Sequence, residues 1–270
     1  MKRMILLTLC VIGVSSILRA AAGFDAPLEK KQVDLALVPG VGNGRNRISC
    51  FYFDQFMVKE IDLGEKGADQ LSIIPFSKDS GKPPCQKDPA KNEIVIPGQG
   101  PGSWSGYFKG VKSQFVFFDA DDGSDGALGF SVFDGRNAKK LFEDAAVGDL
   151  VLTNLNGSST TVRYERAYRG SCSIPKEGQS CWAKIHAEIH VQPSTPPDCA
   201  TGYSESKTYM AHARCKAQNM LGADCFQKDM QTMSRWDDSP SVIGYPVEIA
   251  DLNKPTIRPT GMIISCWPAD

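Results

Sequence analysis

The chain has 270 residues, of which 41% are hydrophobic and 23% charged, and its formal net charge is −1. This composition is typical of a water-soluble globular protein and excludes disordered, collagen-like and polytopic membrane proteins. The 25 glycines and 17 prolines are spread along the chain without a period, which favours a turn-rich β fold over a helical bundle.

The first 22 residues predict a secretory signal peptide. Lys2 and Arg3 precede an apolar stretch at residues 4–18, and alanines at 20–22 form a small-residue cleavage site. The apolar stretch is shorter than the ~20 residues that span a bilayer. Cleavage removes three basic and no acidic residues, which leaves 248 residues with a charge of −4. We therefore expect an exported protein, periplasmic or extracellular, with no integral membrane segment after signal removal and no nucleic-acid partner.

Cysteine usage supports export, because eight cysteines remain after cleavage and an even number in an exported chain predicts disulfides. Their spacing contains no C-x-x-C pair, which argues against thioredoxin-type redox and zinc-finger sites. From local geometry and elimination we expect four bridges, namely Cys50–Cys85, Cys172–Cys181, Cys215–Cys225 and Cys199–Cys266.

Hydrophobic alternation predicts strands through most of the first half of the chain. The run at 48–62 carries large apolar groups on both pleat faces, so we expect one long interior strand there. Further strands are expected at 33–38, 70–76, 93–96 and 112–120, with a polar excursion at 78–93.

Residues 130–145 fit two interpretations. A helix from Asn137 has an apolar stripe that includes Leu141 and Phe142, whereas Asp134-Gly135 favours a hairpin that turns at this point. The clearest turn is Asn156-Gly157, a dipeptide suited to the positive φ angles of a type I′ hairpin between two strands.

The second half changes character after the segment 181–191, which alternates like a strand returning from a hairpin at Cys172. Residues 192–198 are a linker candidate, and 204–220 and 224–238 have helical patterns joined at 221–223. The closing strands are expected to rejoin the sheet. We predict a mainly β fold of antiparallel, sandwich-like sheets with a disulfide-linked helical hairpin near the C-terminus, α+β overall. The expected division is a β-rich domain at 23–191 and a Cys-rich part at 192–270 packed on the same domain.

The predicted strand at 181–191 contains the most specific chemical candidate. Alternation places His186, Glu188 and His190 on one face, with successive side chains ~6.6–6.8 Å apart at Cα, within reach of one Zn²⁺. His212 is the only other histidine. The same alternation is ordinary for the solvated face of any half-buried strand.

Two further loops carry candidate binding residues. An acidic loop with Asp119, Asp121 and Asp125 offers oxygen ligands for Ca²⁺, although it does not match the EF-hand pattern. Trp104 and Tyr107, in a glycine-rich loop, can form an aromatic platform for a sugar or peptide.

These observations favour an exported, disulfide-stabilised module with a binding or structural role and no catalytic residues. We expect it to bind a protein or another cell-envelope component, and we expect no cofactor, because no cofactor fingerprint is present. The alternative is a metal-dependent hydrolase that uses His186, Glu188 and His190.

Overall fold

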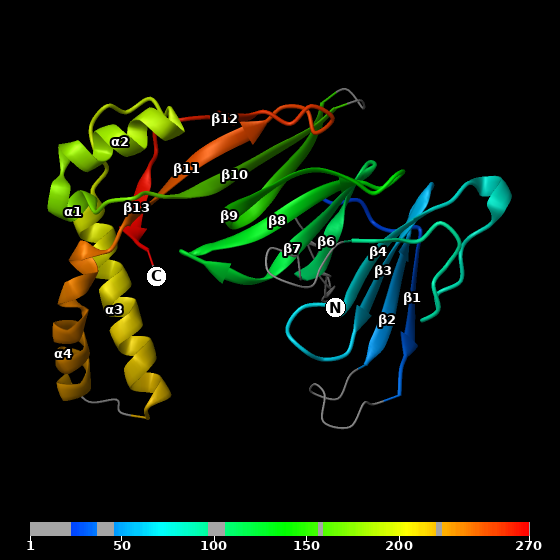
Figure 1. The fold of residues 1–270 in the computed structure, drawn as a ribbon, viewed down its shortest axis with the longest axis horizontal. Coiled ribbons are helices and arrows are strands. Elements are labelled where there is room, and N and C mark those ends of the chain that lie inside the picture. The colour runs from blue at the N-terminus through cyan, green and yellow to red at the C-terminus, as the bar shows by residue number, and fades with distance from the viewer. Residues whose placement is uncertain (1–22, 37–45, 97–105, 156–158, 220–222, 270) are drawn as a thin grey trace, which may run out of the picture.

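The computed structural model describes residues 23–36, 46–96, 106–155, 159–219 and 223–269. The expected signal peptide lies outside these residues. Two antiparallel sheets hold 44% of the chain and helices 23%, which confirms the predicted mainly β fold with a helical hairpin (Figure 1). Within the described ranges, none of the helices is long and apolar enough to cross a membrane.

The first sheet is a five-stranded antiparallel meander in the order β1-β2-β3-β4-β5. Its strands are β1 (Glu29–Asp34), β2 (Arg47–Tyr52), β3 (Phe56–Asp62), β4 (Gln70–Pro75) and β5 (Ile94–Val95). A 3₁₀ turn, η1 (Lys78–Ser80), lies in the polar excursion between β4 and β5.

The expectation of one long strand at 48–62 is wrong, because β2 and β3 are two strands of a hairpin. The chain reverses at Asp54 and Gln55, which are exposed, and the N–H of Phe53 donates to the carbonyl of Phe56 at 2.9 Å. Apolar residues flank the turn on both sides, so the hydrophobic run continues through it. The polar pair Asp54-Gln55 was the only sequence sign of the reversal.

The second sheet has eight strands, and its main path runs in the order β12-β11-β10-β9-β8-β7-β6, with β13 also paired to β11. Its strands are β6 (Gly106–Lys112), β7 (Phe115–Ser124), β8 (Ala127–Asp134), β9 (Lys139–Leu155), β10 (Ser159–Arg169), β11 (Ser241–Ile249), β12 (Ile257–Pro259) and β13 (Ser265–Pro268). The closing strands thus rejoin the sheet, as predicted.

Both predicted hairpins in this sheet are present. β8 and β9 pair around the turn after Asp134, so the hairpin interpretation of residues 130–145 is confirmed and the helical one is wrong. β9 and β10 pair with Leu155 opposite Ser159. The Asn156-Gly157 turn itself lies outside the described residues.

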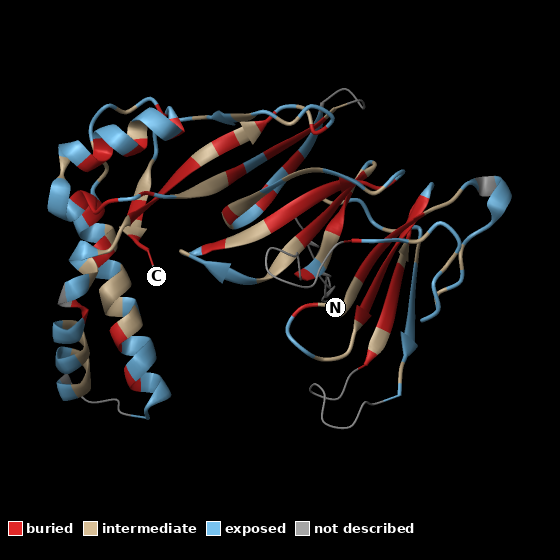
Figure 2. Ribbon diagram, viewed as in Figure 1, coloured by how far each residue is buried: buried red, intermediate tan, exposed pale blue. Residues whose placement is uncertain are grey.

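The eight-stranded sheet is the central layer of the molecule. Along β7, Phe115 and Phe117 face a core shared with the helices, whereas Val116 and Phe118 face a core shared with the five-stranded sheet. All four side chains are at most 1% exposed. Figure 2 shows buried residues concentrated in the strands of both sheets. The eight-stranded sheet is therefore covered on one face by the five-stranded sheet, as in a sandwich, and on the other face by the helices.

The helices gather at one end of the eight-stranded sheet (Figure 1). They are α1 (Ile174–Glu177), α2 (Gln179–Ile189), α3 (Cys199–Ala217) and α4 (Ala223–Thr232), followed by the 3₁₀ segment η2 (Met233–Asp238). The pair α3 and α4 is the predicted helical hairpin. The irregular residues 192–198 join α2 to α3.

The prediction of a strand at 181–191 is wrong, because most of this segment is helix α2. The buried residues Trp182, Ile185 and Ile189 recur at helical spacing, and they pack into the core on the sheet. Ala183 and Ala187 are exposed, although alternation had placed them on the apolar face of a strand.

Four disulfides cross-link the described chain, and they join the four predicted pairs. The bridges are Cys50–Cys85, Cys172–Cys181, Cys199–Cys266 and Cys215–Cys225. Cys172–Cys181 does not close a β-hairpin, since it ties the segment after β10 to the first turn of α2. Cys199–Cys266 fixes the start of α3 to β13. This set of bridges fits an oxidising, exported environment.

Candidate functional site

The predicted zinc ligands do not share a strand face, because they lie in or next to α2. The ring of His186 packs edge-on against Trp182, with centroids 5.6 Å apart. Its Nε2 is buried without a hydrogen-bond partner among the described residues. The carboxylate of Glu188 accepts a hydrogen bond from the Tyr168 hydroxyl. Each side chain therefore has a local packing environment of its own.

His190 follows His186 by one helical turn, and His212 belongs to a different helix, α3. His190 is exposed and ends α2 in the left-handed conformation, with φ at 53°. His212 stacks on Phe226 in the helical hairpin, with ring centroids 4.5 Å apart. Within the part of the chain that the structure describes, no three His, Cys, Asp or Glu side chains form a group that could hold a metal ion. The geometry therefore lends the metal-hydrolase hypothesis no support.

Two of the three aspartates of the proposed calcium loop form ion pairs within the protein. Asp119 on β7 pairs with Lys109 at 2.7 Å, and Asp125 at the β7–β8 turn pairs with Arg169 at 3.2 Å. Burial raises the pKa of Asp119, against the hydrogen bond from Lys109, which lowers it. Asp121 lies beside Gly67 in the β3–β4 loop. The three carboxylates thus belong to different local contacts.

The proposed aromatic platform is described only in part, because Trp104 lies outside the described residues. Tyr107 is on β6 and 38% exposed, and its hydroxyl accepts a hydrogen bond from the N–H of Gly67 at 2.7 Å. This contact links the two sheets, so Tyr107 has a structural role here.

A cluster of polar side chains lies on the helix-covered face of the eight-stranded sheet. The hydroxyl of Tyr164 donates to Asp144 at 2.5 Å, and Nε of Arg166 donates to the same carboxylate at 3.0 Å. Arg166 also donates to the Tyr245 hydroxyl at 3.3 Å. Burial raises the pKa of Tyr164, and the adjacent Asp144 adds to this effect. These groups satisfy one another, which is the arrangement expected of a structural network.

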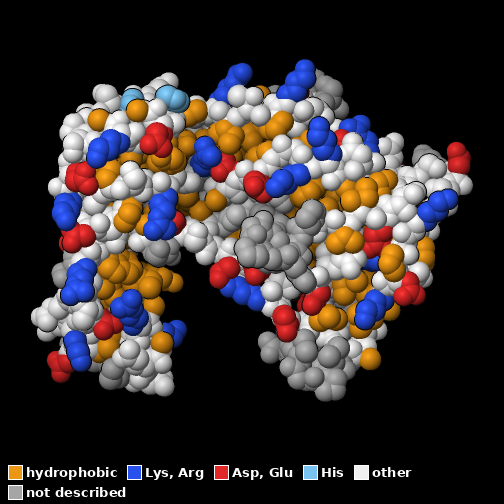
Figure 3. Space-filling view, viewed as in Figure 1, with side chains coloured by type: hydrophobic (Ala, Val, Ile, Leu, Met, Phe, Trp, Pro, Cys, Tyr) orange, Lys and Arg blue, Asp and Glu red, His pale blue; other side chains and the backbone are white. Residues whose placement is uncertain are grey.

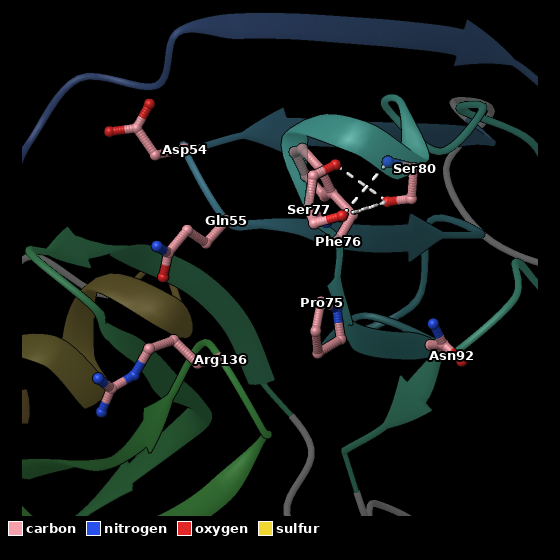
Figure 4. A pocket seen from close by; sticks show the side chains of 8 residues that line it. All are labelled: Asp54, Gln55, Pro75, Phe76, Ser77, Ser80, Asn92 and Arg136. Carbon is pink, nitrogen blue, oxygen red and sulfur yellow. Dashed lines mark hydrogen bonds between the residues drawn. The ribbon is translucent and has the colours of Figure 1, made fainter.

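An open pocket of about 600 Å³ lies where the turns of the two sheets meet (Figure 4). Asp54 and Gln55 from the β2–β3 turn and Arg136 from the β8–β9 turn line it on one side, and Ser77, Ser80 and Asn92 line it on the other. Arg136 is held by Asp134 through two hydrogen bonds of 3.0 and 2.6 Å, and Ser77 and Ser80 cap η1. The guanidinium lowers the pKa of Asp134. Much of the polar lining therefore already has partners within the protein.

A second hollow runs along α3 and is more apolar. One stretch, of about 360 Å³, is lined by Tyr209, Met210, Trp236 and Pro268, together with Glu205 and others. A second stretch, of about 510 Å³, shares Glu205 and Ser206 with the first and reaches Trp267 and Asp198. Since the two stretches share lining residues, they form one groove, which we call the α3 groove. Figure 3 shows hydrophobic side chains over α3 on the side that faces the gap between helices and sheets.

One wall of the α3 groove is a single helix face. Residues 198, 201–202, 205–206 and 209–210 recur every three to four positions, so their side chains lie on one side of α3 from its N-cap onward. The carboxylate of Asp198 caps the helix by accepting from the N–H of Thr201 at 3.2 Å. Tyr209 is 72% exposed, the largest exposed aromatic surface among the described residues.

The opposite wall is held rigidly by β13 and the β7–β8 turn. Nε1 of Trp267 donates to the carbonyl of Asp125 at 2.8 Å, and Gly126 lies against the Trp267 ring. A β-carbon at Gly202 would lie 1.8 Å from the carbonyl oxygen of Cys266, so α3 and β13 touch through their backbones. The Cys199–Cys266 disulfide cross-links α3 and β13 beside this contact.

The sequence alone does not predict the α3 groove, because four separate segments of the chain form it. No family model, curated protein or solved structure matches the chain at a significant level.

Proposed function

We propose that the protein is an exported binding module that holds a protein or another cell-envelope component in the α3 groove, in the periplasm or outside the cell. The observation that carries this proposal is the exposed aromatic and apolar lining of that groove. Tyr209 is 72% exposed there, and the half-buried rings of Trp236 and Trp267 face the same hollow. Concave apolar sites with a few placed polar groups are the usual form of ligand sites.

Rigidity of the walls supports a binding role. The Cys199–Cys266 bridge and the close approach at Gly202 prevent α3 from sliding along β13. A preformed site loses less conformational entropy on binding than one that must order itself, so a rigid groove favours affinity. The Cys199–Cys266 disulfide then supports binding by holding α3 and β13 in a fixed relative position.

The test is a selection from a random peptide library displayed on phage, with the oxidised protein as target. Bound peptides are then measured against Tyr209→Ala, and against Val151→Ala as a matched control. Val151 is 55% exposed on β9 and lines neither stretch of the groove. We expect peptides whose binding falls with Tyr209→Ala and is unchanged with Val151→Ala. Failure to obtain any groove-dependent peptide contradicts the proposal.

Two of the four tryptophans in the chain line the groove, which provides an independent readout. A ligand that covers Trp236 or Trp267 changes the tryptophan emission of the protein. We expect saturable changes in emission with the selected peptides, and none after both residues are replaced by phenylalanine.

A further inference from the structure

The charge of the α3 groove is uniform in sign. Among the described residues that line it, Asp125, Asp198 and Glu205 are acidic, and none is Lys, Arg or His. Asp125 is paired with Arg169, and Asp198 caps α3, so these two carboxylates are engaged. Glu205 is exposed, lies between the two stretches of the groove, and pairs with no described side chain. The groove therefore lacks a cation opposite Glu205.

The apolar lining next to Glu205 suits the side chains that carry such a cation. Tyr209 follows Glu205 by one helical turn, and Trp236 and Met210 line the same stretch. Lysine and arginine have apolar stems that pack on such surfaces while the charged end stays solvated. An ammonium or guanidinium group over a Trp or Tyr ring gains a further cation–π attraction.

The length of the groove fits a short extended segment. From residue 198 to residue 210 the helix face rises by roughly 18 Å, at 1.5 Å per residue. An extended chain covers that length with about five residues, at ~3.3 Å each. A lone small cation would contact only one end of such a groove.

We infer that the α3 groove binds an extended polypeptide segment of about five residues that carries lysine or arginine, with the basic side chain placed between Glu205 and the rings of Tyr209 and Trp236. This inference rests on the proposed binding function and names the class of its ligand.

The experiment compares three labelled synthetic peptides, Lys-Leu-Lys-Leu-Lys, Gln-Leu-Gln-Leu-Gln and Glu-Leu-Glu-Leu-Glu, by fluorescence anisotropy with the full oxidised protein. We expect the lysine peptide to bind most tightly and its binding to weaken with added salt, because surface charge interactions are screened. Glu205→Gln should weaken lysine-peptide binding about two- to fivefold, the range of an exposed ion pair. Tyr209→Ala should weaken it by a similar factor, and Tyr209→Phe should restore it, since the ring supplies the attraction.

Glu65→Gln is the matched control, because Glu65 is an exposed carboxylate in the β3–β4 loop and lines neither stretch of the groove. Its effect on binding should stay within experimental error. Equal affinity for the three peptides, or equal effects of Glu65→Gln and Glu205→Gln, overturns the inference. If the library selection instead gives neutral or acidic peptides that depend on Tyr209, the binding function stands and the inference of a basic ligand is wrong. If neither experiment finds a groove-dependent ligand, both fall together.

Discussion

The buried ion pair between Lys59 and Glu93 gives the sharpest test of how the five-stranded sheet is held together. Lys59 is on β3, and Glu93 ends the polar excursion that covers the outer face of this sheet. The two side chains are 1% and 2% exposed, and Nζ lies 2.7 Å from Oε2. Glu93 also accepts hydrogen bonds from the N–H of Ala90 and from Gln70, both at 2.8 Å. We therefore expect Lys59→Met to leave a buried carboxylate without its counter-charge.

Removing one partner of a buried ion pair costs about 3–5 kcal/mol, because the remaining charge is desolvated without compensation. For a protein of this size, 1 kcal/mol corresponds to roughly 2–4 °C in Tm. The melting temperature of Lys59→Met should therefore fall by roughly 6–20 °C. The double variant Lys59→Met/Glu93→Gln removes both charges and keeps an acceptor for Ala90, so it should recover much of this loss.

The assays are thermal unfolding, which gives Tm, and urea unfolding, both followed by far-UV circular dichroism with disulfides intact. Lys66→Met is the matched control, since the Lys66–Asp122 pair is 59% and 71% exposed. Exposed pairs contribute about 0–1 kcal/mol, so the control should unfold near the wild-type midpoint. The reasoning is refuted if Lys59→Met lowers the stability of the protein no more than Lys66→Met does. It is also refuted if the double variant loses as much stability as Lys59→Met and Glu93→Gln lose together.

The same pair predicts acid sensitivity. Burial acts to raise the pKa of Glu93, but the hydrogen bonds from Lys59, Ala90 and Ser72 outweigh it and leave the pKa below its ordinary value. A carboxyl whose folded pKa is depressed contributes stability above its unfolded pKa, and that contribution is lost as the pH falls through the folded value. Acid unfolding below about pH 4.5 should therefore be less steep in the double variant than in the wild type.

Three further predictions concern the other half of the molecule. Replacing Cys215 and Cys225 by serine opens a bridge of sequence separation 10, and it should cost about 2–3 kcal/mol, measured by urea unfolding; an unchanged midpoint would contradict this. Gly202→Ala should cost about 1–3 kcal/mol, because its β-carbon would lie 1.8 Å from the Cys266 oxygen and must push α3 away from β13; a melting temperature equal to wild type would show that the contact is looser than described. Burial, and then a neighbouring carboxylate, raises the pKa of Tyr168 to about 12, so tyrosine absorbance at 295 nm should lose a late-titrating component in Tyr168→Phe. The stability that comes from this raised pKa is present below pH ~10 and is lost as the pH rises further. If the absorbance difference between the wild type and Tyr168→Phe is complete near pH 10, the raised pKa is contradicted.

Much of the covalent frame and the hairpins was predictable from sequence, because short-range signals specify them. Asp-Gly and Asn-Gly dipeptides are typical of turns, and the strands that flank Asp134-Gly135 and Asn156-Gly157 do pair as hairpins. In the turn after Asp134 the residue with a positive φ is Ala138, at 55°. Cys172 and Cys181 are close in sequence, so almost any local reversal brings them together. Their bridge was therefore predicted correctly although the predicted hairpin was wrong.

Segment 181–191 shows why periodicity alone misled. Its apolar residues alternate, yet Ile185 and Ile189 are also four residues apart, and both templates fit. The two intervening alanines counted as apolar in the strand interpretation, but a small side chain is tolerated on an exposed helix face. If only the large apolar residues are counted, Trp182, Ile185 and Ile189 remain, and their spacing is helical. The error placed Glu188 on one face with His186 and His190, whereas on a helix a residue two positions away points to the opposite side.

The sequence does not predict the α3 groove, because segments far apart in the chain form its walls. The sequence of α3 nevertheless contains one indication of the groove. The buried residues of this helix are Cys199, Tyr203, Ala211 and Cys215, which form the stripe that faces the sheet and the hairpin partner. Tyr209 lies off that stripe and is exposed, so core packing does not account for it, whereas Met210, seven residues after Tyr203, lies on the stripe and is half-buried. A large apolar residue off the buried stripe either covers another element or faces a partner. The structure places Trp236 and Pro268 beside these two residues and leaves Tyr209 72% exposed, so the surface they share is the one that the proposed ligand would cover.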